Sequence, residues 1–226
     1  MSGFGTRVGR GSPDQGPIAT LGRGNAVPTE GKGVMDALVE YGDAIRRNID
    51  RVQAVRVDQL AGPTPCRDWD VTALLTHLIG GHEMFAAALG QPAPTVDAEH
   101  DPSVTVLATR YRTAAAASLD AFAAPGALQR VVALPIGEVP GEVALGMALT
   151  DAVVHGWDLA VATGQDTTID DRVAGPLLAG AQASITDELR QPAGARAVFA
   201  QPVPIDPDSP AGDRLVAFLG RSPQFR

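Results

Sequence analysis

Three polar residues on one predicted helix, Asp151, His155 and Asp158, have the types and the spacing to take part in metal binding. Residues three or four positions apart lie on the same face of an α-helix, on successive turns. The remainder of this face is apolar: Ala144, Met147, Ala148, Leu159 and Ala162. A carboxylate and an imidazole near one turn apart recur as metal ligands inside helical bundles. Asp151 and His155 therefore predict part of a metal site, with a further ligand from another helix.

Three histidines elsewhere in the chain could complete such a site: His77, His82 and His100. Two histidines and one carboxylate suit zinc or another divalent first-row metal ion, with positions left open for water or substrate. His82 lies near the middle of the apolar face of the helix predicted after Asp70, whereas His77 lies on its flank. Periodicity alone favours His82, but a flank can also face the interior, because a bundle helix packs against several neighbours. We expect His100 to be solvated in a loop.

Each of these polar residues also has a structural interpretation. Asp151 and His155 could form an ordinary surface pair, which at this spacing contributes only about 0.2–0.5 kcal/mol. Asp158 could fix the tautomer of a metal-binding histidine, or accept hydrogen bonds from another helix or an arginine, and we favour the structural role. Cys66 could be a soft metal ligand or a reactive thiol, but a lone cysteine in a turn between prolines is more often a small buried hydrophobe.

Apolar residues spaced three to four positions apart predict an all-α protein built on a four-helix bundle. The four long helices are expected over residues 35–61, 71–89, 102–124 and 142–163. Asp70 and Asp101 are expected to cap the second and third of these helices, and Gly164 to end the fourth. Trp69 and Trp157 are interpreted most simply as packing residues.

Two further features surround this bundle. Before the fourth helix, the run RVVALPIGEVPGE predicts a short β-hairpin or an extended crossover. After it, we expect a helix over residues 173–189, with Pro176 in its first turn or bending it, and a short helix capped by Ser209. The fold class is therefore an all-α bundle with a small β element and extra C-terminal helices.

Size and composition exclude several classes of protein. A chain of 226 residues with 45% hydrophobic residues can form one domain, which we place at residues 34–226 after a flexible glycine-rich tail at 1–33. A net charge of -8 opposes nonspecific binding of nucleic acid or anionic membranes. With a single cysteine and no secretion signal, we expect a cytoplasmic protein without an intramolecular disulfide. An alanine-rich face over residues 114–117 predicts a homodimer.

Two runs carry a resemblance to a known family: TPCRDWDVTALLTHLIGG at residues 64–81 and DAVVHGWDLAVATGQ at residues 151–165. They resemble the mycothiol-dependent maleylpyruvate isomerase N-terminal domain family, which belongs to the DinB-like metal-binding superfamily. The closing run DRLVAFLGRSP is similar to a metal-binding subgroup of that family. The resemblance implies a DinB-like four-helix bundle in which His77, Asp151 and His155 bind a divalent metal ion, usually zinc. It thus favours His77 over His82.

The resemblance also implies a chemistry. Members of the family use mycothiol, a small thiol, as cosubstrate in isomerisation or thiol transfer. A free thiol has a pKa of about 8.5, and coordination to a dication deprotonates it beside a small electrophile. The resemblance therefore implies a mycothiol-dependent isomerase or S-transferase that acts through a metal-bound thiolate.

One departure from the family limits this expectation. The isomerases of the family carry a further C-terminal domain, whereas here only residues 164–226 follow the fourth helix, so maleylpyruvate isomerisation itself is not expected. The alternatives are a metal-dependent hydrolase, with Asp158 as the base, and a bundle that binds a metal or small ligand without turnover.

Overall fold

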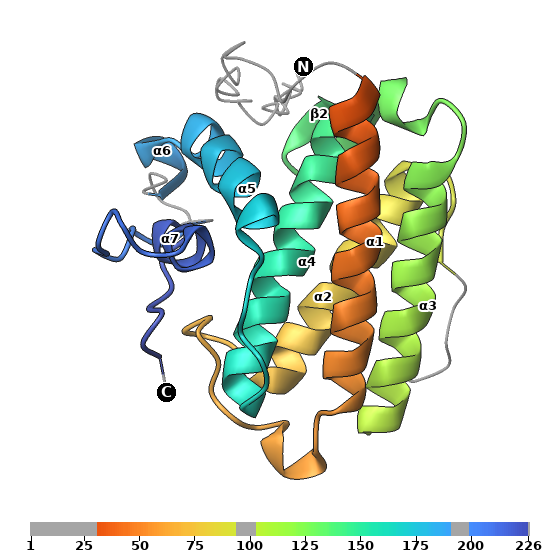
Figure 1. Ribbon diagram of the computed structural model, residues 1–226. Helices are drawn as coiled ribbons and strands as arrows, with labels where there is room; N and C mark the ends of the chain where they lie inside the picture. Colours follow the sequence, from red (N-terminus) through yellow and green to blue (C-terminus); the bar gives the residue numbers. More distant parts are fainter. Residues whose placement is uncertain (1–30, 94–102, 191–198, 226) are drawn as a thin grey trace, which may run out of the picture.

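Four long helices form a bundle in the computed structural model, which describes residues 31–93, 103–190 and 199–225 (Figure 1). They are α1 (Gly31–Gln53), α2 (Val71–Ala88), α3 (Val104–Ala123) and α4 (Gly141–Thr163). Helix α1 packs against α3 and α4, and α2 packs against the same two helices from the other side. The predicted all-α four-helix bundle is confirmed. Of the tail predicted at residues 1–33, residues 1–30 lie outside the described residues, and residues 31–33 form the start of α1 instead.

Residues next to the helices explain where three of them begin or end. The Asp70 carboxylate accepts a hydrogen bond from the Ala73 N–H at 2.8 Å and caps α2, as predicted. The cap of α3 is Ser103, whose hydroxyl accepts from Val106, whereas Asp101, which we expected there, lies outside the described residues. Helix α1 ends earlier than its apolar pattern suggests, because the chain then turns through a short 3-10 helix, Val57–Gln59.

A two-stranded antiparallel hairpin precedes α4, as predicted. Its strands are β1 (Val131–Leu134) and β2 (Gly137–Pro140), with Leu134 opposite Gly137 at the turn. The residue at the turn has φ of +118°, a conformation that requires glycine. The hairpin runs directly into α4, whose other end is closed by Gly164 at φ of +70°, as expected from the sequence.

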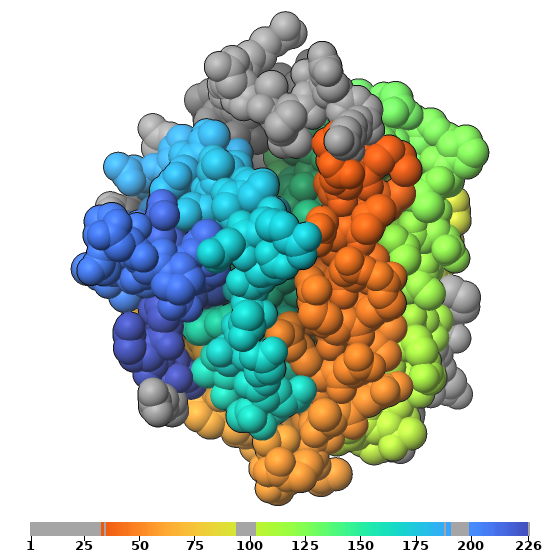
Figure 2. Space-filling model, in the orientation of Figure 1, coloured from red at the N-terminus to blue at the C-terminus, as the bar shows by residue number. Residues whose placement is uncertain are grey.

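Three shorter helices follow α4 and lie together on one side of it (Figures 1 and 2): α5 (Asp171–Ser184), α6 (Asp187–Arg190) and α7 (Ala211–Phe218). The helix predicted over 173–189 is thus divided in two. The division occurs because Ile185 adopts an extended conformation, with φ of -93° and ψ of 100°.

Two prolines lie within or directly before these helices. Pro176 lies inside α5, beyond its first turn, so the first of its two expected places is wrong. Helix α7 is preceded directly by Pro210, and the N–H of its first residue, Ala211, donates to the Asp171 carboxylate at 3.0 Å, so the predicted cap at Ser209 is wrong.

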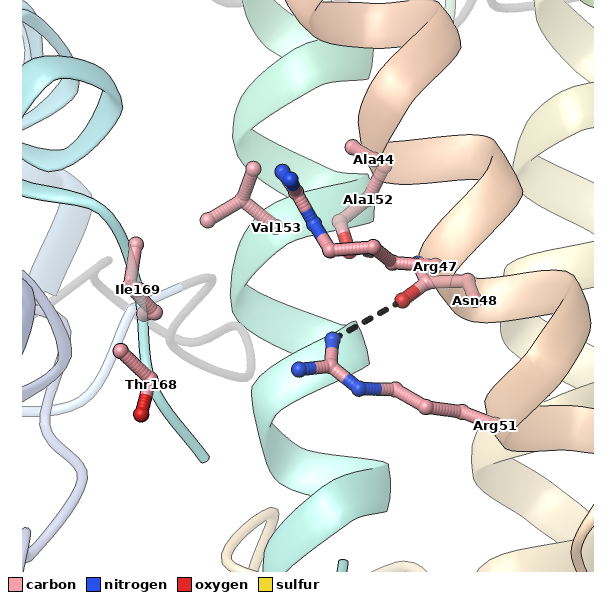
Figure 3. Close-up of a pocket in the computed structure, with 8 residues that line it drawn as sticks. All are labelled: Ala44, Arg47, Asn48, Arg51, Ala152, Val153, Thr168 and Ile169. Carbon is pink, nitrogen blue, oxygen red and sulfur yellow. Dashed lines mark hydrogen bonds between the residues drawn. The ribbon is translucent and has the colours of Figure 1, made fainter. Parts of the chain in front are cut away.

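Helices α1 and α4 approach each other closely around Asn48, as Figure 3 shows. The buried Asn48 amide donates to the Ala152 carbonyl of α4 at 2.7 Å and accepts from Arg51 at 3.2 Å. A Cβ atom on Gly156 of α4 would clash with this amide. The glycine therefore permits the contact that positions α4, the helix that carries two of the predicted metal ligands, against α1.

Two observations bear on partners. In the described part of the chain, no helix combines the length and the apolar character needed to cross a membrane. Ala114 and Ala115 are buried in the chain's own core, so the alanine-rich face is less exposed than the sequence suggested. The homodimer stays a prediction.

Candidate metal centre

The side chains of His77, Asp151 and His155 meet between α2 and α4. The Asp151 Oδ1 atom lies 3.2 Å from His77 Nε2 and 3.5 Å from His155 Nε2. All three candidate ligand atoms lie within 4.8 Å of one another. A tetrahedral zinc ion with ligands at about 2.0–2.1 Å holds its donor atoms about 3.3 Å apart, and the two distances from Asp151 match this spacing. The structure therefore brings together the three residues that the resemblance selected.

The exposure of this group increases towards α2. The side chain of His155 is 12% exposed, that of Asp151 28% and that of His77 37%. Gly81, one turn after His77 on α2, leaves room here, because a Cβ atom on it would lie 3.3 Å from Asp151 Oδ2. The group is therefore partly exposed to solvent, and most so at His77.

The charge of Asp151 suits a metal ligand. Burial raises the pKa of this carboxyl, but the neighbouring imidazoles of His155 and His77 outweigh burial and hold its pKa below the ordinary value. Asp151 is therefore ionised at neutral pH, as metal coordination requires.

Trp69 covers the two imidazoles from the loop before α2. Its ring centroid lies 4.5 Å from that of His77 and 5.6 Å from that of His155. Thr64 orders this loop, since its hydroxyl donates to the Trp69 carbonyl at 2.8 Å and accepts from the Cys66 N–H at 3.1 Å. Sequence reasoning treated Trp69 as a packing residue. The only sequence signal for its place at the site is that it lies within the TPCRDWD run that carries the family resemblance.

Asp158 lies behind His155 and is fully buried. Its Oδ2 atom accepts from His155 Nδ1 at 2.9 Å and from Arg221 Nη2 at 3.0 Å. Burial raises the pKa of Asp158, but the His155 hydrogen bond and the Arg221 charge outweigh burial and lower it. An ionised Asp158 places the His155 proton on Nδ1, which leaves the Nε2 lone pair facing Asp151. Both contacts considered for Asp158, with a histidine and with an arginine, are thus present together.

Cys66 contacts polar side chains of this site, whereas we expected it to be a small buried hydrophobe. Its sulfur lies 3.1 Å from Asp158 Oδ2, 3.1 Å from Arg221 Nη2 and 3.7 Å from His155 Nδ1. Burial, with the nearby Asp158 charge, raises the pKa of the Cys66 thiol to about 12. The thiol is therefore protonated and donates to Asp158. Arg221 was missed from the sequence, where only its place in the closing DRLVAFLGRSP run marked it.

His82 lies apart from this group, in the bundle core. Its Nδ1 atom lies 2.8 Å from the Tyr41 hydroxyl and its Nε2 atom 3.2 Å from the Tyr111 hydroxyl. Burial lowers the pKa of His82 to about 4, so this imidazole is neutral at pH 7. Periodicity correctly indicates that His82 is buried, but its buried side faces α1 and α3 rather than Asp151 and His155. His100 lies outside the described residues.

Comparisons with known proteins identify the family of this chain. The family model described as the mycothiol maleylpyruvate isomerase N-terminal domain matches residues 41–160, which contain all three donors. Two curated relatives in Mycobacterium tuberculosis are the "Uncharacterized protein MT0763" of strain CDC 1551 / Oshkosh and the "Uncharacterized protein Rv0738" of strain ATCC 25618 / H37Rv. Each is 40% identical over 168 residues, which is 74% of this chain and 88% of the relative. No solved structure matches. The chain belongs to the mycothiol maleylpyruvate isomerase N-terminal domain family.

Proposed function

We propose that this protein binds a divalent first-row metal ion, zinc foremost, through His77, Asp151 and His155, and uses it with the thiol mycothiol on a small electrophile. The reaction class is isomerisation or thiol transfer. One observation carries the proposal: the ligand atoms of two imidazoles and an ionised carboxylate lie within 4.8 Å of one another, and the His77 side chain is partly exposed to solvent. Membership in a family whose description includes mycothiol supports the choice of thiol.

The donor set suits this chemistry because three protein ligands leave coordination positions open. A bound dication would lower the pKa of an incoming thiol and so supply a thiolate at neutral pH. The chain's own residues would bind the metal ion and surround it. His77, Asp151 and His155 provide the donors, Trp69 shields the imidazoles, and the exposed edge of His77 admits the cosubstrate.

The hydrolase alternative loses its proposed base. Asp158 would have to accept a proton from water, but its carboxylate is fully buried and already accepts from His155 and Arg221. It also lies on the Nδ1 side of His155, whereas the donor set lies on the Nε2 side. The geometry therefore argues against hydrolysis with Asp158 as the base.

The first test is the metal content of purified protein by elemental mass spectrometry. Wild type should hold close to one equivalent of metal, and His77→Ala and His155→Ala should each lose most of it. His82→Asn is the matched control, because it removes a histidine of α2 that lies outside the donor group. Wild type that holds no metal even after incubation with zinc would refute the proposal.

The second test separates thiol chemistry from metal binding alone. A panel of small electrophiles is offered to metal-loaded protein with and without mycothiol, and consumption of each electrophile is measured. We expect turnover only with mycothiol present, and its loss in His155→Ala. Turnover that does not need the thiol would contradict the proposed cosubstrate.

A further inference from the structure

The imidazole of His155 lies between two groups of potential metal ligands. Its Nε2 atom faces Asp151 at 3.5 Å, in the group described above. Its Nδ1 atom faces Asp158 at 2.9 Å and the Cys66 sulfur at 3.7 Å. Cys66, His155 and Asp158 also offer ligand atoms within 4.8 Å of one another. We call His77, Asp151 and His155 the Nε2 group, and Cys66, His155 and Asp158 the Nδ1 group.

Arg221 occupies the Nδ1 group. Its Nη2 atom lies 3.0 Å from Asp158 Oδ2 and 3.1 Å from the Cys66 sulfur, and its Nε atom lies 3.3 Å from Asp158 Oδ1. Its Nη1 atom donates to the Leu219 carbonyl at 2.8 Å, which fixes the guanidinium in this place. A guanidinium stays protonated at any pH that a protein tolerates. A permanent positive charge therefore stands where a metal ion bound to Cys66 and Asp158 would have to lie.

The backbone of the C-terminal segment brings Arg221 to this position. Helix α7 ends at Phe218, and the chain reverses at Gly220, whose φ is +86°. The Arg221 N–H then donates to the Val216 carbonyl at 2.9 Å, which anchors the turn. The Arg221 side chain is only 14% exposed. The contact is therefore part of the packed structure and not a loose surface pair.

We propose that Arg221 is a positioning residue that closes the Nδ1 group to metal and orients His155, so that the ion is held by the Nε2 group. The inference rests on the proposed function in assuming that the Nε2 group binds metal. Arg221 acts in two ways. Its charge opposes a cation at Cys66 and Asp158, and its hydrogen bonds hold Asp158 where it accepts the Nδ1 proton of His155.

Removal of the guanidinium has a distinctive consequence. Thiolate, imidazole and carboxylate together form a donor set suited to zinc or cobalt. Without Arg221, the Cys66 thiol can release its proton to solvent as its sulfur binds the metal ion. The Nε2 group should at the same time lose about 10-fold in metal affinity, the usual effect of disturbing a residue that orients a ligand.

The test is a titration of the metal-free full chain with Co2+, followed by absorption spectroscopy. Cobalt bound to a thiolate gives a sulfur-to-metal charge-transfer band, whereas cobalt bound to histidine and carboxylate does not. Wild type should bind Co2+ without this band. Arg221→Gln should gain the band, and Arg221→Gln combined with Cys66→Ser should lose it again. Arg221→Lys, which keeps a positive charge, should resemble wild type.

Two controls keep the test decisive. Arg190→Gln removes another buried arginine of the C-terminal segment, one that stacks on Phe218 at 4.5 Å, and should leave the Co2+ spectrum unchanged. Cys66→Ser alone is a near-isosteric change, and its measurement does not require Arg221→Gln to fold. Its Co2+ affinity should match that of wild type, because Cys66 is no ligand while Arg221 is present.

The outcomes separate the inference from the proposed function. A charge-transfer band in wild type, its absence in Arg221→Gln, or a 10-fold loss of Co2+ affinity in Cys66→Ser would each overturn the role of Arg221. Wild type that binds no Co2+ while Arg221→Gln gains the sulfur band would refute the proposed function and support the closing role. If neither wild type nor Arg221→Gln binds Co2+, both the proposed function and the role of Arg221 are refuted.

Discussion

The same substitution, glycine to alanine, should have opposite effects at two positions of α4. A Cβ atom on Gly146 would meet nothing within 4 Å, whereas one on Gly156 would clash with the buried amide of Asn48. Alanine is favoured over glycine inside a helix by about 1 kcal/mol, and this gain applies at both positions. Gly146→Ala should therefore raise the free energy of unfolding by about 1 kcal/mol.

At Gly156 two costs oppose that gain. The added methyl group must displace a packed side chain, which costs about 1–3 kcal/mol. Displacement also breaks the 2.7 Å hydrogen bond from Asn48 to the Ala152 carbonyl, and a buried amide left without a partner costs about another 1–3 kcal/mol. After subtraction of the helix-propensity gain, Gly156→Ala should lower the free energy of unfolding by about 3 kcal/mol.

Urea unfolding followed by circular dichroism measures both variants. A loss of about 3 kcal/mol at Gly156 lowers the midpoint by roughly 1–2 M urea, since the slope for a protein of this size is about 2 kcal/mol per M. Adding Asn48→Ala to Gly156→Ala should recover part of the loss, because the smaller residue removes the clash. If alanine is tolerated equally at Gly146 and Gly156, the close α1–α4 contact argued from the structure is wrong.

The remaining predictions concern metal, acid and fluorescence. Zinc at 100 times its dissociation constant should stabilise wild type by about 2.7 kcal/mol, measured as a higher melting temperature, and should leave Asp151→Ala unchanged. The folded pKa of His82, about 4, lies below its unfolded value of about 6.5. Stability should therefore be complete above pH 6.5 and fall by about 3 kcal/mol as pH drops through 4, a fall that urea titrations should find reduced in His82→Gln. Co2+ should quench tryptophan fluorescence, and Trp69→Phe should lose most of that response because Trp69 covers both histidines.

The fold could be predicted because its signals are local. Asp70 and Gly164 act on the backbone within a few residues, one by accepting an N–H bond and the other by adopting a positive φ. The Asp151 and His155 pair is equally local, since one helical turn fixes its geometry. The break at Ile185 had no such signal, because isoleucine is compatible with a helix; in the structure this residue is extended and its side chain packs against the core.

The choice between His77 and His82 could not be made from periodicity, and the reason is geometric. Both histidines lie on α2, five positions apart, so their side chains point in different directions around the helix. One direction faces α4 and the donor group, and the other faces the Tyr41 and Tyr111 hydroxyls. Because a bundle helix is buried on more than one side, an apolar pattern shows that a position is covered but not what covers it. The family resemblance supplied that missing information.

Arg221 shows why part of the site lies beyond sequence reasoning. It is 63 positions from Asp158 and 155 from Cys66, so no spacing rule connects them. The match to the family model ends at residue 160, before the C-terminal helices begin. A fully buried carboxylate such as Asp158 is costly unless it is paired and hydrogen-bonded. His155 bonds it from within the four-helix bundle, and the guanidinium of Arg221 adds a charged partner from outside the bundle. The matched region holds the three donors, whereas the orientation of His155 depends on the segment after it. The bundle and the C-terminal helices therefore act as one unit at the candidate metal centre.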